Sequence, residues 1–449
     1  MTKVIAIRRE DLSKPGEQRV ALTPEYMGWL CAQGVRGLVQ PARHPETMEC
    51  KRAFEDLDYI EAGAEVTEDL GAAELIVGLK EIDVDAILPN KAYLLFSHTH
   101  KGQVKNRAML RAFQERHCTL IDYELLCKQD GQRLLTAFTY FAGYAGMIDT
   151  LWAFGLRMEY LGVETLFSQM HQSIQSGGLE NVRYLLQETL AQQIRTHGTS
   201  KEMPPVITCF LGRGKTSSGA QEIYDWLPCQ EISLAELPGV FAHGKRDRVY
   251  KLVLEVYDMY RLIDTQLSAA VGNTHEQKFR HYLEHPECYT SNLDQVLPYI
   301  SMLMNCILWS PKYPRVLPTE LLAELGERSA LQLIGDITCD PNGAIEFSHE
   351  TWIDSPLFTF DAQSQSETEG HEAPGVVVMA VTNLPCEFPA EASLQFADEL
   401  KPLLPELRDA RWQDSWEDVG FSETLRNATL LWQGEFTPKY AYMKKFLED

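Results

Sequence analysis

Short apolar runs alternate with helical periodicity in the first third of the chain. The apolar runs predict strands at residues 4–7, 38–40, 75–79, 93–97 and 119–123, and residues 24–33 predict a helix. Strands that alternate with helices are typical of a parallel sheet with helices on both faces. This region therefore predicts an α/β domain.

The pattern changes after this region. Residues 143–162 form one long apolar stretch without a β-rich interruption, which predicts a helix that connects two domains. A second amphipathic helix is predicted over 179–195, followed by an apolar strand at 206–210. Further strands are predicted at 331–336 and after Gly375, whereas the polar, acidic stretch 359–375 predicts an exposed loop.

Composition limits the classes of partner. The chain has 449 residues, which corresponds to two or three domains at about 150 residues each. Its 41 Lys and Arg against 64 Asp and Glu give a formal net charge of -23. Such an acidic surface repels phosphate backbones and anionic lipid. We therefore expect no nucleic-acid partner and no membrane partner, and an anionic ligand must meet a locally basic pocket.

Cysteine usage and the N-terminus bear on location. The 10 cysteines are scattered, without a CxxC pair or a cluster at metal-ligand spacing, so reduced thiols are the simpler interpretation. The N-terminus lacks the apolar core of a secretory signal, and no run of about 18 uncharged apolar residues is present. These features predict a cytoplasmic protein.

A glycine-rich turn, LGRGKTSSGA, follows the strand predicted at 206–210 and precedes a helix. Glycines at such a turn let the backbone approach a pyrophosphate, and the helix N-terminus favours its negative charge. Gly219 lies five residues beyond Gly214, where the regular fingerprint has a spacing of three. A dinucleotide site and a plain structural turn are both open. Arg213 and Lys215 could face a phosphate, and a solvated basic loop is the alternative.

The choice between NAD and NADP normally depends on an acidic residue about 20 positions after the glycines, which binds the ribose diol of NAD. Glu231 and Glu236 both suit this distance. The spacing therefore leaves the two cofactors open.

Ionisable residues lie at or just beyond the ends of four predicted strands, within residues 8–19, 78–81, 96–101 and 121–124. The carboxyl ends of parallel strands converge on one crevice. Lys80 and His98 would form an acid–base pair there, since burial and a neighbouring cation lower the pKa of a lysine. The alternatives are a solvated or ion-paired Lys80 and a capping or hydrogen-bonded, buried His98.

Other residues of these segments suit a substrate with charged groups. Arg19 or Lys101 could hold a carboxylate, Arg19 through a two-pronged hydrogen bond, and Glu124 could orient an ammonium group. His98 and His100 form a His-x-His pair, but no third metal ligand lies nearby in the sequence. We therefore expect no metal site.

At these residues the chain resembles the lysine–ketoglutarate reductase portion of the aminoadipic semialdehyde synthases, within the alanine dehydrogenase and lysine-forming saccharopine dehydrogenase group. Several ordered segments carry the resemblance and are more specific than any single motif. They include VIAIRREDLSKPGEQRVALTP, LIVGLKE, LLFSHTHKGQ, LIDYELL, FAGYAGMIDTL, LGRGKTSSGAQEIYDWLPC, HPECYTSNLDQVLPYISMLMNCILW, DITCDPNGAIEF and NLPCEFPAEAS.

The resemblance implies an activity and a set of site residues. The activity is the condensation of L-lysine with 2-oxoglutarate and the reduction of the imine by NADPH to give saccharopine. Lys80 and His98 would be the acid–base pair, and Arg19, Lys101 and Glu124 would bind the substrates. NADPH or NADP, with NAD as the alternative, would bind Gly212, Arg213, Gly214, Ser217, Ser218, Gly219, Ala220 and Asp336.

The same resemblance implies an α/β fold of two Rossmann-like, doubly wound parallel-sheet domains with the active-site cleft between them. It places a substrate domain of the alanine dehydrogenase N-terminal type at residues 1–140 plus 346–449. A dinucleotide-binding domain would occupy residues 141–345. The expected partners are small molecules, and a homo-oligomer is compatible with this organisation.

The chain departs from the animal members of the group at two places. The turn reads GRGKTSSGA here and approximately GTGNVSKGA there, and His100 replaces an apolar residue. Three alternatives stay open. They are an opine-type imine reductase with another amine or oxo acid, an NAD-linked lysine-forming saccharopine dehydrogenase, and a non-catalytic relative that binds a nucleotide or an amino acid.

Overall fold

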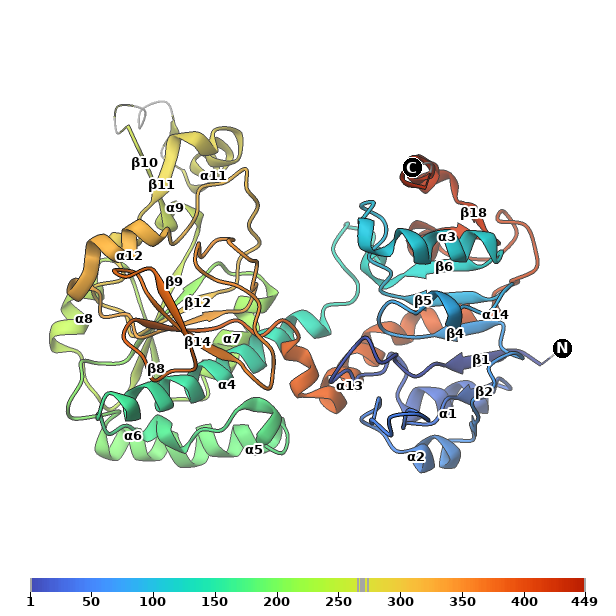
Figure 1. Cartoon of the computed structure of the whole chain (residues 1–449), viewed down its shortest axis with the longest axis horizontal. Helices are drawn as coiled ribbons and strands as arrows, with labels where there is room; N and C mark the ends of the chain where they lie inside the picture. The colour runs from blue at the N-terminus through green and yellow to red at the C-terminus, as the bar shows by residue number, and fades with distance from the viewer. Residues whose placement is uncertain (1, 265, 267–270, 273, 448–449) are drawn as a thin grey trace. The chain divides into compact units, whose positions relative to one another are not determined.

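Two compact units make up the chain (Figure 1). The computed structural model describes residues 2–264, 266, 271–272 and 274–447. Unit 1 comprises Met1–Phe138 and Pro389–Asp449, and unit 2 is the continuous segment Thr139–Phe388. Within the described residues, each unit has an eight-stranded sheet in which parallel strands predominate. The predicted α/β class with two domains is confirmed.

The sheet of unit 1 has the strand order β18-β17-β6-β5-β4-β1-β2-β3. The chain adds β2 and β3 on one side of β1 and then β4, β5 and β6 on the other, so its direction switches between β1 and β4. Ligands bind at such a switch point, outside the carboxyl ends of the strands. The parallel strands are β1 (Val4–Ile7), β2 (Arg36–Val39), β3 (Glu65–Val66), β4 (Leu75–Val77), β5 (Ala92–Leu95) and β6 (Thr119–Asp122).

The C-terminal segment completes this sheet. β17 (Thr429–Trp432) pairs antiparallel with β6, and β18 (Glu435–Phe436) pairs antiparallel with β17. Alternate residues of a strand face opposite sides, and here both sides are buried. One core contains Ile5 with α1 (Pro24–Ala32), α13 (Pro389–Leu400) and α14 (Leu404–Asp409), and the other contains Ala6 with α3 (Arg107–Glu115). The strand ends are therefore the part of the sheet that ligands reach.

The sheet of unit 2 has the order β15-β14-β16-β13-β12-β7-β9-β8. β7 (Ile207–Leu211) pairs in parallel with β12 (Met302–Asn305) on one side and with β9 (Val249–Leu254) on the other. β8 (Cys229–Ile232), which follows β7 in the sequence, lies outside β9 at the edge. The switch point of unit 2 therefore lies between β7 and β12.

Residues 346–388 lie in unit 2, whereas the resemblance placed them in the substrate domain. The reason is strand pairing, because β16 (Val376–Met379) adds in parallel to β13 (Leu333–Asp336). The segment thus completes the sheet of unit 2, and the chain returns to unit 1 only at Pro389.

The stretch 359–375 contains strands and is not the predicted loop. β14 (Leu357–Asp361) pairs antiparallel with β16, and β15 (Ser366–Glu369) pairs antiparallel with β14. All four side chains of β15 are exposed. Its acidic composition is that of an exposed edge strand, which charges protect from pairing with another chain.

The helices match the predictions in kind. The connecting helix α4 (Ala137–Tyr160) begins earlier than predicted, and the boundary between the units falls within it. The helix predicted over 179–195 consists of α5 (Leu179–Tyr184), a π-helical turn (Leu185–Leu190) and α6 (Ala191–His197). Within the described residues, no helix is long and apolar enough to cross a membrane.

Candidate active site

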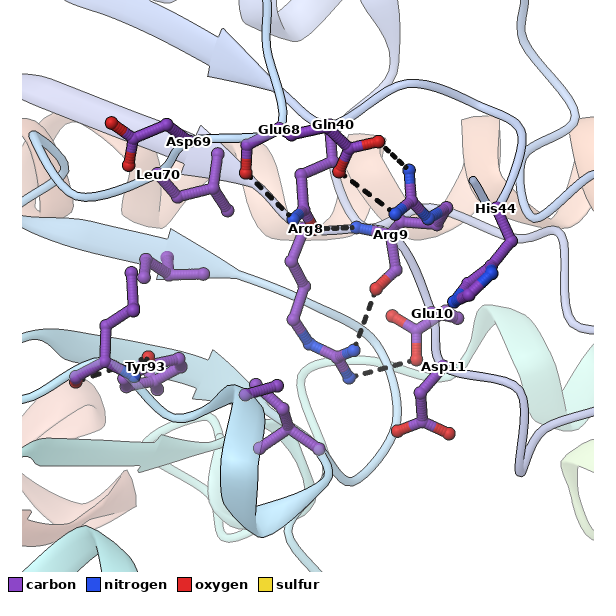
Figure 2. A pocket seen from close by; sticks show the side chains of 14 residues that line it. Arg8, Arg9, Glu10, Asp11, Gln40, His44, Glu68, Asp69, Leu70 and Tyr93 are labelled. Carbon is purple, nitrogen blue, oxygen red and sulfur yellow. Dashed lines mark hydrogen bonds and ion pairs between the residues drawn. The ribbon is translucent and has the colours of Figure 1, made fainter. Parts of the chain in front are cut away.

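A cavity of about 300 Å³ lies at the carboxyl ends of the first strands of unit 1 (Figure 2). Its arginines are already paired. Arg9 donates from both terminal nitrogens to the two oxygens of Glu68, at 3.0 and 3.1 Å, and Arg8 donates to Glu10 at 3.1 Å. Neither Lys80 nor the other predicted site residues line this cavity. The Arg8–Glu10 pair connects this cavity to the backbone of Lys80.

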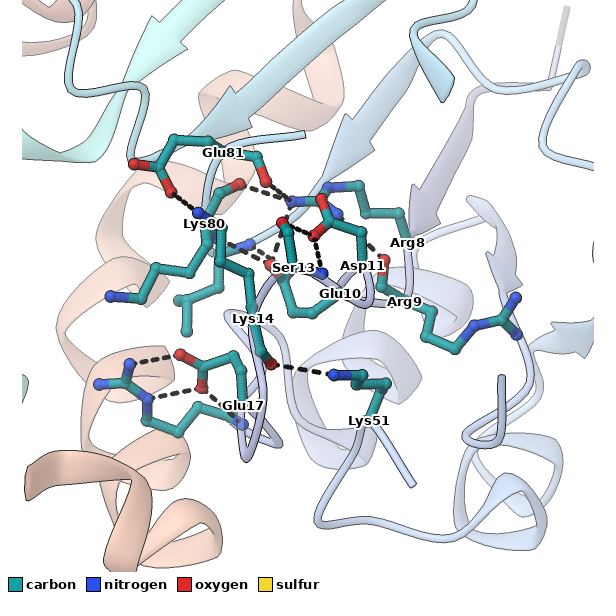
Figure 3. A network of polar contacts seen from close by, with 12 residues as sticks. Arg8, Arg9, Glu10, Asp11, Ser13, Lys14, Glu17, Lys51, Lys80 and Glu81 are labelled. Atoms are coloured by element: carbon teal, nitrogen blue, oxygen red, sulfur yellow. Dashed lines mark hydrogen bonds and ion pairs between the residues drawn. The ribbon is translucent and has the colours of Figure 1, made fainter. Parts of the chain in front are cut away.

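The Arg8–Glu10 pair joins the segments that follow β1 and β4, at the switch point of unit 1 (Figure 3). Nη2 of Arg8 also donates to the backbone oxygens of Lys80 (2.5 Å) and Glu81 (3.2 Å). Glu10 accepts the backbone N–H of Lys80 at 3.0 Å. Gly78 is needed for this arrangement, because a Cβ there would lie 2.3 Å from Nε of Arg8. The pair thus fixes the backbone that carries Lys80.

Arg19 makes the two-pronged hydrogen bond that the sequence predicts, but its partner is a protein carboxylate. Nε and Nη2 donate to the two oxygens of Glu17, at 2.8 and 2.6 Å, and the guanidinium lies 4.3 Å from the ring centre of Phe138. Burial raises the pKa of Glu17, but Arg19 and the charge of Lys80 outweigh it and lower the pKa to about 2. Glu17 is therefore ionised, and it balances two predicted site cations.

His98 lies just beyond β5, the strand that pairs with β4. Its Nδ1 is 2.8 Å from Oε1 of Glu81, and Nζ of Lys14 is 2.9 Å from Oε2 of the same carboxylate. Burial raises the pKa of Glu81, but the hydrogen bonds from His98 and Lys14 outweigh this and hold the pKa well below its usual range. An ionised carboxylate that accepts from Nδ1 orients the ring and leaves Nε2 to exchange protons.

The backbone of His98 is held in an uncommon conformation. Its φ is +47°, in the left-handed region that few residues other than glycine adopt. Nδ2 of Asn106 donates to the backbone oxygens of Ser97 (3.2 Å) and His98 (3.3 Å) and so stabilises this turn. Backbone strain of this kind is concentrated at functional sites, where the surrounding contacts hold the strained conformation in place.

Lys101 and Glu124 form a separate polar cluster, in which Nζ of Lys101 is 3.4 Å from Oε1 of Glu124. The same oxygen is 3.2 Å from Nη2 of Arg133. Nδ1 of His100 lies 3.5 Å from Oε2 of Glu124 but makes no hydrogen bond to the described residues. Burial lowers the pKa of His100 and outweighs the nearby carboxylate, so the ring favours its neutral form. The two predicted substrate ligands thus pair with each other.

In unit 2, the glycine turn has the geometry of a phosphate-binding turn. Gly212 follows β7 with a φ of +82°, and a Cβ there would lie 2.8 Å from Cγ2 of Ile307. Gly214 is the N-cap of α7 (Lys215–Tyr224), whose first N–H groups are available to an anion. Ser217 is buried and donates to the backbone oxygen of Gly212 at 2.7 Å, so it stabilises the turn from within.

The later residues of the motif have a packing role. A Cβ on Gly219 would lie 2.5 Å from the backbone oxygen of Tyr140, and one on Gly143 would lie 2.2 Å from that of Thr216. α7 therefore contacts α4 almost backbone to backbone, which is the role of the last glycine in a dinucleotide fingerprint. Ala220 is fully buried at this contact, and Ser218 continues the helix by donating its N–H to Gly214.

The structure identifies an acidic residue that the sequence spacing missed. Glu255 directly follows β9, the strand next to β7, which is where a dinucleotide fold places the ligand of the adenosine ribose. The segment that contains β8 and α8 (Leu237–His243) lies between α7 and β9 and moves Glu255 beyond the expected 20 positions. Arg213 lies between two carboxylates, with Nε 3.2 Å from Glu255 and Nη2 3.5 Å from Glu231. Glu236 accepts hydrogen bonds from Ser233 in its own turn.

Asp336 ends β13 inside a buried polar network. Its Oδ1 accepts from Nδ2 of Asn305 (2.8 Å), Oγ1 of Thr338 (3.1 Å) and the backbone N–H of Cys339 (3.2 Å). Burial raises the pKa of Asp336. Oδ1 of Asn305 is buried and has no hydrogen-bond partner among the described residues. An unpartnered acceptor beside the glycine turn fits a bound dinucleotide, which carries hydrogen-bond donors.

In the described part of the chain, no group of three or more His, Cys, Asp or Glu side chains could hold a metal ion. Unit 1 thus carries the predicted acid–base residues at the ends of its strands, and unit 2 carries the glycine turn.

Comparisons with known proteins agree with an α/β fold of two domains. Residues 6–145 match the family model described as alanine dehydrogenase/PNT, N-terminal domain. A solved L-alanine dehydrogenase aligns with a TM-score of 0.60 at 17% identity, covering 99% of both chains. A transhydrogenase from Sinorhizobium meliloti aligns with a TM-score of 0.56 at 16% identity, covering 97% of this chain and 99% of that one. At such identities these structures show the shared fold.

Sequence relatives extend along nearly the whole chain. The α-aminoadipic semialdehyde synthase of Arabidopsis thaliana is 33% identical over 98% of this chain and 41% of its own length. The mitochondrial α-aminoadipic semialdehyde synthase of Mus musculus is 32% identical over 99% of this chain and 48% of its own length. The saccharopine dehydrogenase [NAD(+), L-lysine-forming] of Emericella nidulans is 23% identical over 93% and 96%. The chain thus spans a little under half of the semialdehyde synthases.

Residues 6–145 are therefore similar to the alanine dehydrogenase/PNT N-terminal domain. Nearly the whole chain is similar to part of the α-aminoadipic semialdehyde synthases and, at lower identity, to the lysine-forming saccharopine dehydrogenases. The resemblance stated from the sequence is confirmed.

Proposed function

We propose that the chain condenses L-lysine with 2-oxoglutarate and reduces the resulting imine with a nicotinamide nucleotide to give saccharopine. The observation that supports it most directly is the position of Lys80 and His98 after the neighbouring strands β4 and β5. Each is associated with an ionised carboxylate, Glu17 for Lys80 and Glu81 for His98. The names of the relatives, which include a lysine-forming saccharopine dehydrogenase, support the choice of substrates.

The proposed reaction needs three proton transfers before the reduction. The ε-ammonium of lysine loses a proton to Nε2 of His98, and the free amine attacks the ketone carbon. The nitrogen of the adduct gives a second proton to the former ketone oxygen, which yields the carbinolamine. Lys80 then protonates the carbinolamine hydroxyl, which leaves as water, and the protonated imine forms. Positioned acid–base groups of this kind typically contribute 10²–10⁴-fold to the rate.

The substrate charges suit the ion pairs of unit 1. We propose that a substrate carboxylate takes the place of Glu17 at Arg19, and that another takes the place of Glu124 at Lys101. The released glutamates then accept the ammonium groups of lysine. Each of these cations already has a carboxylate partner, so replacing that partner by a substrate carboxylate leaves the local charge unchanged. The cations thus provide the locally basic contact that an anionic substrate needs on a chain with a net charge of -23.

We propose that the dinucleotide binds at the turn from Gly212 to Gly214 and the start of α7, where backbone N–H groups face its pyrophosphate. When bound, it supplies the hydride that reduces the imine carbon. NADPH is the leading cofactor, because the resemblance implies it and Arg213 is a cation suited to the extra phosphate.

One observation favours a second candidate, an NAD-linked enzyme that runs in the lysine-forming direction. Glu255 occupies the position that normally binds the ribose diol of NAD, and it pairs with Arg213 at 3.2 Å. A carboxylate at this position repels a ribose phosphate. The relative strength of Arg213 and Glu255 therefore decides the cofactor.

The test of both candidates is initial-rate oxidation of NADPH and, in parallel, of NADH, with L-lysine and 2-oxoglutarate at neutral pH. Controls omit each substrate in turn. Turnover that needs both substrates supports the proposal, and the faster nucleotide separates the two candidates. Turnover only with a different amine or oxo acid would indicate an opine-type reductase. Binding of ligands without any turnover would indicate a non-catalytic relative.

A further inference from the structure

The side-chain amide of Asn305, the last residue of β12, is buried and only half satisfied. Nδ2 donates to Oδ1 of Asp336 and to Oγ1 of Thr338, both at 2.8 Å. Oδ1 has no partner among the described residues, although Asn305 is only 1% exposed. A buried carbonyl oxygen without a hydrogen bond destabilises the fold, so its presence calls for a reason.

The neighbours fix which end of the amide is unsatisfied. Oδ1 of Asp336 accepts the backbone N–H of Cys339, so this oxygen acts as an acceptor and needs a donor from Asn305. Thr338 donates its own hydroxyl proton to the same oxygen, and its lone pairs accept from Nδ2. A flipped amide would lose both contacts. The unsatisfied atom is therefore the carbonyl oxygen.

The position of Asn305 points to the dinucleotide. Asn305 pairs with Leu211 in the register of β12 and β7, directly before Gly212 of the turn. A Cβ on Gly212 would come within 2.8 Å of Ile307, so the segments that follow β7 and β12 are in close contact. This is the switch point of unit 2, across which a dinucleotide lies in this fold class. β12 and β9 lie on opposite sides of β7. Glu255, which follows β9, marks the adenosine side, so Asn305 lies on the other side.

We propose that Oδ1 of Asn305 accepts a hydrogen bond from the carboxamide NH₂ of the nicotinamide ring. The inference rests on the proposed function for the class of cofactor. An amide oxygen is only an acceptor, and the carboxamide NH₂ is only a donor, whereas the ribose hydroxyls can satisfy one another and water in both roles. Asn305 is then a positioning residue, which orients the ring while Asp336 and Thr338 orient Asn305.

The experiment compares oxidised nicotinamide dinucleotide with its 3-acetylpyridine analogue, in which a methyl group replaces the carboxamide NH₂. Dissociation constants are measured by titration calorimetry on the full chain, for the NAD and NADP forms, and ADP-ribose measures the adenosine half alone. We expect the wild type to bind the natural dinucleotide about fivefold to tenfold more tightly than the analogue, as one lost hydrogen bond implies.

The variant Asn305→Ala should weaken the natural dinucleotide by about the same factor and leave the analogue and ADP-ribose unchanged, so that the preference disappears. Thr338→Val is the matched control. It removes a hydrogen bond from the same network, keeps Oδ1 of Asn305, and should retain a preference for the natural dinucleotide.

Two results would overturn the assignment. One is equal affinity of the wild type for the natural dinucleotide and for the analogue. This comparison does not depend on the folding of any variant. The other is a preference that persists in Asn305→Ala. If the wild type binds ADP-ribose and neither dinucleotide, or binds none of the three, the proposed cofactor itself is wrong, which is a different outcome.

Discussion

Single carboxylates organise the cations of unit 1. Glu10 pairs with Arg8, Glu17 with Arg19, and Glu81 with His98 and Lys14. The sequence predicts Lys80, His98 and Arg19 as site residues because they are unusual types at strand ends. It does not single out Glu17 or Glu81, since an acidic residue in an acidic chain carries little information until its partner is known.

We predict that Glu81→Gln lowers kcat about 10-fold to 100-fold, because loss of the carboxylate that orients a functional histidine has effects of this size. Dinucleotide affinity should not change, since Glu81 lies in unit 1. The measurement is steady-state kinetics with a separate binding titration. Glu68→Gln, which breaks the Arg9 pair away from Lys80 and His98, is the control and should keep kcat within about twofold. Equal losses in the two variants would contradict the role of Glu81.

We predict that cofactor preference responds to Glu255. Replacing it by Ser removes the carboxylate that repels a ribose phosphate and frees Arg213 from its 3.2 Å partner. The ratio of NADPH to NADH affinity should rise about tenfold or more, as a change of one charge contact allows. Glu236→Gln, at the position that the spacing also suggested, should leave the ratio unchanged. A ratio that responds to Glu236 and not to Glu255 would contradict the structural assignment.

A buried pair of carboxyl groups in unit 2 makes stability depend on pH. Asp149 accepts the backbone N–H of Ser173 at 2.7 Å, and Glu387 accepts that of Ile174 at 3.0 Å. Burial and the neighbouring Asp149 raise the pKa of Glu387 to about 10. The folded chain therefore keeps a proton that the unfolded chain releases above its ordinary glutamate pKa. Stability should fall as the pH rises from the ordinary pKa towards 10.

We predict that Glu387→Gln removes part of this fall, because the amide is neutral at every pH. The variant should gain stability relative to the wild type between pH 5 and pH 9, by on the order of a few kcal/mol. Denaturant unfolding at the two pH values measures the difference. The same pH dependence in both proteins would show that Glu387 does not hold the proton.

At the scale of elements, the contact between α4 and α7 supports the glycine turn. Both helices contribute a glycine that lets the backbones meet. We predict that Gly143→Ala destabilises the fold by about 1–3 kcal/mol, because its Cβ would lie 2.2 Å from the backbone oxygen of Thr216. The matched control is Gly239→Ala in α8 (Leu237–His243), where a Cβ meets nothing within 4 Å. Thermal unfolding should show a loss only for Gly143→Ala.

Elements differ in how well the sequence predicts them. The parallel strands β1, β2, β4, β5 and β6 of unit 1 are predictable because both faces of the sheet are buried, so each contains an apolar run. The edge strand β3 is not predicted, because it has two residues and its Glu65 is exposed. The β14–β15 hairpin is not predictable either, because all side chains of β15 are exposed and polar or acidic, so the strand has no apolar run. Glu255 is missed for a third reason. Only the pairing of β9 with β7 shows that it, and not Glu231, follows the strand next to the turn.

At the scale of the whole molecule, the number of units is predictable and their boundary is not. The chain enters unit 2 once and leaves it once, at Thr139 and Phe388. The return point is set by β16, which pairs with β13 and not with any strand of unit 1. Pairing between distant segments leaves no local signal in composition, so the boundary predicted at residue 346 had to come from resemblance alone.

The most direct test of the account follows a deuterium atom. NADPH deuterated at C4 of the nicotinamide is mixed with L-lysine and 2-oxoglutarate, and the product is analysed by mass spectrometry. We predict saccharopine with one deuterium at the carbon that was the ketone of 2-oxoglutarate, formed only when both substrates are present. Consumption of the nucleotide without deuterium in saccharopine, or no saccharopine with either NADPH or NADH, would contradict the central claim.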